Sequence, residues 1–103
     1  MIYYNKAIRD KIPDIIKDSG KNCNVKKLLD SEFLTELEKK LTEELEEYMK
    51  SKDIEELADV LEVIYRISEL KGMNHEKLEM IREDKAKKRG KFNNNLFLID
   101  AEE

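Results

Sequence analysis

Residues 42–67, TEELEEYMKSKDIEELADVLEVIYRI, contain the ends of the two strongest helical patterns in the chain and the short break between them. Before the break, apolar residues recur every three or four positions, as on one face of a helix: Leu34, Leu37, Leu41, Leu45 and Tyr48. This pattern predicts a helix over residues 31–50, capped by Ser31 or Asp30. A second helix is predicted to begin at Asp53, with Glu56 in a capping-box-like position, and to end near Leu70 or Lys71, before Gly72.

Shorter elements are predicted on both sides of this pair. A helix should begin near Asp10, with Pro13 in its first turn, and stop at Gly20. Another should begin after the Asn74 cap and run from His75 to Lys88 or Arg89, before Gly90. Two apolar runs, Val25–Leu29 and Leu96–Ile99, are short enough to pair as strands. We therefore predict a single all-α domain over residues 1–103: an antiparallel bundle of about four helices, with room for a minor two-stranded β element.

Composition narrows the class of protein. Charged residues make up 43% of the 103 residues, but the net charge is only −4, which argues against a general nucleic-acid-binding surface. Cys23, the single cysteine, has no partner for an intramolecular disulfide, and there is no Cys/His cluster for zinc. No apolar run resembles a signal peptide or a membrane span. We expect a soluble, cytoplasmic protein.

Acidic residues border the apolar faces of the two central helices. Glu44 and Glu47 lie one turn apart beside the leucine stripe, with Glu43 just beyond them. In the next helix, Glu56 falls inside an unusually wide apolar arc and Asp59 falls at its edge. Burying an uncompensated carboxylate costs several kcal/mol, on the order of the stability of a small domain. A positive group should therefore compensate this cluster.

An antiparallel hairpin would bring the two acidic edges together. Oxygen ligands without His or Cys suit Mg²⁺, or Mn²⁺, and without a cation the carboxylates would raise one another's pKa. Taken alone, the run Glu43 to Glu47 also fits a solvated helix face, paired with Lys39 and Lys40 at spacings of three and four residues.

Paired E-x-x-E and E-x-x-D helical motifs make the chain resemble the MazG-like, or all-alpha NTP pyrophosphatase, superfamily, in its short, single-domain, phosphoribosyl-ATP pyrophosphohydrolase-like branch. The resemblance covers nearly the whole chain. One departure is that only eight residues separate Glu47 from Glu56, fewer than the superfamily usually has. Four segments carry the resemblance: Tyr4 to Lys6 with Arg9 to Pro13, Glu43 to Glu47, Glu56 to Leu61, and Lys88 to Phe92.

The resemblance implies a hydrolase: Mg²⁺-dependent cleavage of a nucleoside triphosphate, or a related nucleotide, to the monophosphate and pyrophosphate, with nucleotide-pool house-cleaning as a family-level role. It implies metal ligands at Glu44, Glu47, Glu56 and Asp59. Glu43 and Glu47 are the expected catalytic carboxylates, which orient or activate the attacking water. The triphosphate also needs positive side chains. The candidates are Arg9, Lys11, Lys85, Lys88 and Arg89, although the last three also fit ordinary charge at a helix C-terminus.

The wide apolar arc from Ile54 to Ile67 is more than one small chain can cover, so self-association is expected, and the resemblance also suggests a homodimer or homotetramer. Two alternatives stay open. The substrate could be phosphoribosyl-ATP, or the chain could be a non-enzymatic helical oligomer that acts as a regulatory or interaction module.

Overall fold

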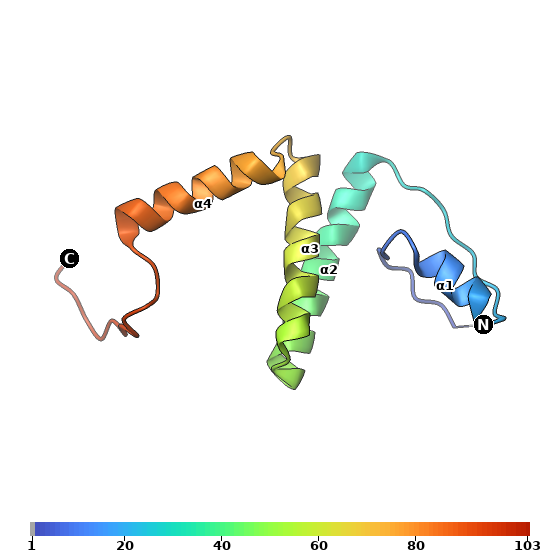
Figure 1. The fold of residues 1–103 in the computed structure, drawn as a ribbon, viewed down its shortest axis with the longest axis horizontal. Coiled ribbons are helices and arrows are strands. Elements are labelled where there is room, and N and C mark those ends of the chain that lie inside the picture. The colour runs from blue at the N-terminus through green and yellow to red at the C-terminus, as the bar shows by residue number, and fades with distance from the viewer. Residues whose placement is uncertain (1) are drawn as a thin grey trace.

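The computed structural model describes residues 2–103, which form four helices joined by irregular segments (Figure 1). The helices, in chain order, are α1 (Ile12–Asp18), α2 (Asp30–Ser51), α3 (Ile54–Leu70) and α4 (His75–Arg89). The all-α class and the number of helices are therefore confirmed.

The predicted β element is wrong, since residues 2–103 contain no strand. Val25–Leu29 belongs to the connection between α1 and α2, whereas Leu96–Ile99 belongs to the tail after α4. Figure 1 shows these two segments on opposite sides of the central helices. Their backbones are too far apart to form the hydrogen bonds of a two-stranded sheet.

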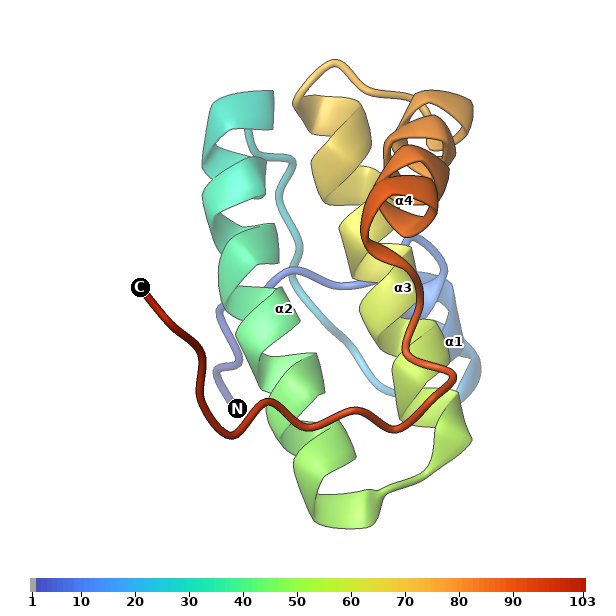
Figure 2. The same ribbon diagram turned by 90° about the vertical axis from the view of Figure 1, so that its left-hand side faces the viewer.

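Helices α2 and α3 form an antiparallel hairpin, which contains most of the packing in the chain (Figures 1 and 2). Lys52, with a φ of 61°, makes the tight connection in the left-handed conformation, and its N–H donates to the Tyr48 carbonyl at 2.7 Å. The core between the helices is small. Buried Leu37 and Val63 meet there with Ala7 of the N-terminal segment, and four partly buried residues surround them: Phe33, Leu41, Ile67 and Leu70.

The helix ends follow local signals in most cases. Asn74 caps α4 by accepting a hydrogen bond from the Lys77 N–H at 2.9 Å, as predicted. Gly72 and Gly90 follow α3 and α4 with φ values of 88° and 83°, which a side chain would disfavour. The predicted cap of α2 is wrong, because the N-cap is Leu29, whose N–H donates to the Glu32 carboxylate at 3.1 Å.

Helix α4 stands apart from the hairpin instead of completing a bundle. Among the helices it contacts only α3, and none of its residues is buried. Its large apolar residues are only three, Leu78, Met80 and Ile81, too few to form a face that would fold it back along α3. None of the helices within residues 2–103 combines the length and apolar character that crossing a bilayer takes.

Candidate metal centre

Five carboxylates from α2 and α3 gather at the hairpin. Glu44, Glu56 and Asp59 each offer one oxygen, and these three oxygens lie within 4.8 Å of one another. Glu43, Glu44 and Glu47 form a second group with the same spacing. Since Glu44 belongs to both groups, the two helices share one continuous cluster. The structure therefore brings together all four predicted metal ligands and the additional carboxylate of Glu43.

Glu44 is the most enclosed member of the cluster. Its side chain is buried, with a relative exposure of 6% for the residue, and it sits on the α2 face that packs against α3. Two buried carboxylate oxygens accept no hydrogen bond from the described residues, Glu44 Oε2 and Glu56 Oε2. A buried oxygen without a donor is costly, and these two face one acidic cluster from different helices.

The pKa values report the same conflict. Loss of hydration raises the pKa of Glu44, and repulsion from Glu47 and Asp59 raises it further, against the opposing effect of Lys40. The pKa of Glu56 is raised as well, first by loss of hydration and then by the negative charges of Glu47, Asp59 and Glu44. The protein thus holds these two carboxylates where their ionised forms are disfavoured unless a cation is near.

Three basic side chains partly neutralise the cluster. Lys40 lies one turn before the glutamates, with its Nζ 3.4 Å from Glu44 Oε1 and 3.6 Å from Glu43 Oε1. Lys6 donates to Glu43 at 3.0 Å, which lowers the pKa of Glu43 and raises the pKa of Lys6. Arg9 donates to Asp59 Oδ1 at 2.6 Å.

The N-terminal segment carries Lys6 and Arg9 to the cluster because Ala7 anchors it. The Ala7 methyl group is buried against Leu37 of α2 and Val63 of α3. On either side of this anchor, Lys6 reaches α2 and Arg9 reaches α3. The segment therefore spans both helices of the hairpin and brings one positive charge to each.

Of the predicted phosphate-binding residues, the structure brings only Arg9 to the carboxylates. Lys11 is exposed at the start of α1. Lys85, Lys88 and Arg89 lie toward the end of α4, which points away from the hairpin on the side opposite α1 (Figure 1), and Lys88 pairs with Asp84 of its own helix at 3.0 Å. Within one chain, then, the second basic group is separate from the site.

Two basic residues at the cluster were missed as site residues. The spacing of Lys40 to Glu43 and Glu44 is a local signal, since it fits pairing along one helix face, but it suggested only a solvated surface. Lys6 is 37 residues away from Glu43 in the sequence, and no local pattern links them.

The donor set fits a hard divalent cation. The available ligands are carboxylate oxygens only, they come from two rigid helices, and two of them lack any other donor. Mg²⁺ and Mn²⁺ prefer such oxygens, whereas Zn²⁺ favours His and Cys. A cation bound among these carboxylates would relieve the repulsion within the cluster.

Comparison of the chain with protein families, with curated proteins and with solved structures found no match.

Proposed function

We propose that this chain is a Mg²⁺-dependent nucleotide pyrophosphohydrolase of the MazG-like kind, which hydrolyses a nucleoside triphosphate or a related nucleotide to the monophosphate and pyrophosphate. The observation that carries the proposal is the pair of buried oxygens, Glu44 Oε2 and Glu56 Oε2, which face a shared acidic cluster without a hydrogen-bond donor. Acidic residues on a solvated helix face would have no reason to be buried in this way.

Each carboxylate has a role under this proposal. Glu44, Glu47, Glu56 and Asp59 would hold the ion, and Glu43 or Glu47 would orient the attacking water and accept its proton. Mg²⁺ supplies charge neutralisation at the phosphate oxygens and a more acidic bound water. Lys6 lowers the pKa of Glu43, so this carboxylate is fully ionised at neutral pH and can accept a hydrogen bond that orients the water.

The N-terminal cations answer a second requirement of the reaction. Carboxylates alone would repel a triphosphate, so positive donors must stand beside them. Arg9 lies at the edge of the cluster, and its guanidinium can form two parallel hydrogen bonds to a phosphate group. Its present partner Asp59 is one of the proposed metal ligands, so ion binding would free the Arg9 side chain for the substrate.

The proposal is tested by turnover. Canonical, deoxy and damaged triphosphates, together with phosphoribosyl-ATP, are incubated with Mg²⁺, and monophosphate and pyrophosphate are separated by chromatography. We expect release of both products from at least one nucleotide. Preference for phosphoribosyl-ATP would change the substrate but keep the chemistry, whereas no product from any nucleotide would favour the non-enzymatic interaction module.

Matched variants locate the activity. Glu56→Gln and Asp59→Asn should abolish turnover without unfolding the chain, as judged by circular dichroism. Glu55→Gln is the control, because Glu55 is an exposed neighbour on α3 that belongs to neither carboxylate group. Full activity in the Glu56 and Asp59 variants would remove the proposed site.

A further inference from the structure

The chain exposes far more surface than a self-sufficient domain of its size. Its accessible area is 9780 Å², whereas a compact monomer of 12.2 kDa exposes about 6,100 Å². Its radius of gyration is 18.0 Å, against about 13 Å for a compact chain of this length. The excess of roughly 3,700 Å² is the size of a large, permanent protein interface, not of a few surface residues.

Part of this excess lies on the hairpin end, which we define as residues 43–62. Five large apolar side chains are exposed there, on two adjacent helices and the turn that joins them: Leu45, Met49, Ile54, Leu57 and Leu61. The same stretch contains nine acidic and two basic residues. Lys6, Arg9 and Lys40, which lie outside this stretch, pair with three of its acidic residues: Glu43, Asp59 and Glu44. The surface is therefore apolar and still net negative.

The complementary surface lies on the C-terminal arm, which we define as residues 85–99. It contains five basic residues, Lys85, Lys87, Lys88, Arg89 and Lys91, and no acidic residue. Its five large apolar side chains are between 80% and 98% exposed: Phe92, Leu96, Phe97, Leu98 and Ile99.

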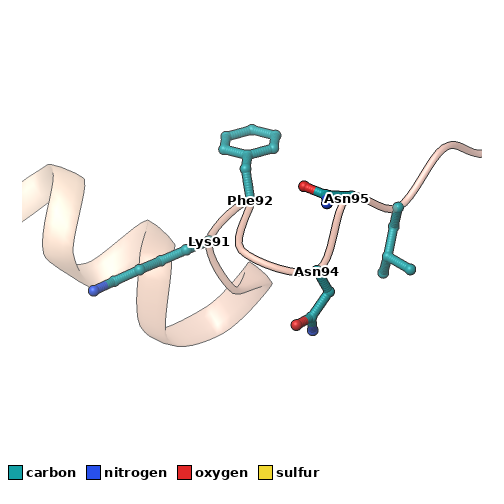
Figure 3. A pocket seen from close by; sticks show the side chains of 5 residues that line it. Lys91, Phe92, Asn94 and Asn95 are labelled. Carbon is teal, nitrogen blue, oxygen red and sulfur yellow. The ribbon is translucent and has the colours of Figure 1, made fainter.

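Within residues 2–103, the five large apolar side chains of the arm stay exposed, and the basic part pairs only with its own helix, through Lys88 and Asp84. Figure 1 shows the arm at the outer end of α4 and below that end, away from α2 and α3, and Figure 2 shows it in front of the hairpin as seen from that side. Figure 3 shows the turn at Phe92 from close by, with the Phe92 and Asn94 side chains pointing to opposite sides of the backbone. The small pocket there is lined only by residues of the arm itself. The Phe92 and Phe97 rings are therefore not covered by the hairpin.

We propose that the C-terminal arm of one copy docks on the hairpin end of a second copy. The basic part of the arm faces the acidic residues of the hairpin, and the apolar part of the arm covers the exposed leucines and methionine. The two surfaces are opposite in charge and both are apolar, and every copy of the chain carries both of them. We therefore take the partner of each surface to be a second copy of the same chain. An exchange of arms between two copies closes the pair and uses both surfaces of each chain.

The exchange has a consequence for the carboxylate cluster, which lies within the hairpin end. Lys85, Lys88 and Arg89 of the partner subunit would stand beside carboxylates that the same residues of their own chain do not reach. A complete phosphate-binding group would then need two copies. The docking itself does not depend on the proposed hydrolase activity, and it is tested below without any turnover measurement.

The first test is the mass of the native protein by light scattering at micromolar concentration. We expect at least twice 12.2 kDa for the wild type. Phe97→Asp places a charge in the docked arm and should weaken the association by about tenfold or more. Val25→Asp is the matched control, since Val25 is also exposed but lies in the connection before α2, and its mass should equal that of the wild type.

The second test shows which surfaces meet. Unlabelled and ¹⁵N-labelled protein are mixed in urea, the urea is removed, and a zero-length carbodiimide reagent then joins lysines to nearby carboxylates. We expect linked peptides that pair an arm lysine of one label with a hairpin glutamate of the other. A monomeric wild type, an unchanged mass for Phe97→Asp, or arm-to-hairpin links of a single label only would each overturn the proposal.

Discussion

Replacing Glu44 by Gln should stabilise the metal-free protein, although it removes a side chain from the centre of the hairpin. The carboxylate is buried, and no group within residues 2–103 donates a hydrogen bond to its Oε2. Such an oxygen costs about 1–3 kcal/mol, and Lys40, which lies 3.4 Å from Glu44, keeps Glu43 as a partner at 3.6 Å after the substitution. Glutamine keeps the shape, loses the charge and can donate to a neighbouring carboxylate. We expect a net gain of about 1 kcal/mol, which raises Tm by roughly 4–8 °C.

The effect should depend on pH with a defined sign. Burial raises the pKa of Glu44 in the folded state above its ordinary value of 4.5. The ionised carboxylate therefore opposes folding at neutral pH, and this penalty disappears as the pH falls through the raised pKa toward 4.5. The difference in Tm between Glu44→Gln and the wild type should be largest at neutral pH and should shrink in acid.

Mg²⁺ should make the wild type more stable than Glu44→Gln, which reverses the order of their Tm values. At a free concentration ten times its Kd, an ion that binds only the folded state adds about 1.4 kcal/mol to the stability of the wild type. Glu44→Gln loses a ligand and should gain much less. Differential scanning calorimetry in EDTA and in Mg²⁺, at one protein concentration, measures both effects, with Glu46→Gln as the exposed control. A destabilised Glu44→Gln variant that keeps the full response to Mg²⁺ would refute the reasoning.

Three further predictions concern the surroundings of the site. Arg9→Ala should raise KM for the nucleotide about tenfold. Arg66→Ala, which breaks the 3.9 Å ion pair between Arg66 and Glu69 within α3, should leave KM unchanged, and equal KM values for the two variants would remove Arg9 from the site. Lys6→Met should return the pKa of Glu43 toward its usual value, so the acidic limb of the rate profile moves to higher pH; an unmoved limb would contradict the role of Glu43. Asn74→Ala should cost about 1 kcal/mol and speed amide hydrogen exchange at the start of α4, and unchanged exchange would exclude the cap.

The helices were largely predictable because their signals are local. Apolar spacing located α2 and α3, and the observed bounds differ from the predicted ones by about a residue. Asn74 and Gly90 delimit α4 as predicted, since a cap and a left-handed stop act within one turn of the backbone. The paired strands failed for the opposite reason. Their pairing depended on two distant segments meeting, and no local pattern in Val25–Leu29 specifies where the tail goes.

The acidic cluster was predictable in its members, but only in part in its surroundings. Helical spacing put Glu44 and Glu56 toward the apolar faces, and an antiparallel hairpin then forces their edges together. The contacts of Lys6 and Arg9 depend instead on the packing of Ala7 against α2 and α3. A single small residue in an irregular segment gives no sequence signal for that packing. The antiparallel bundle was predicted from the short loops between the helices. Helix α4 nevertheless lies apart from the hairpin, because it has too few apolar residues to pack along α3.

The most direct measurement is a crystal structure of the protein soaked in Mn²⁺, with data collected at the manganese absorption edge. We expect an anomalous peak within ligand distance of Glu44 and Glu56, with further oxygens from Glu47 and Asp59. We also expect Arg9 to move off Asp59 in that structure. If the carboxylates are ordered but no manganese peak appears at saturating Mn²⁺, then the carboxylates of α2 and α3 do not bind a divalent ion.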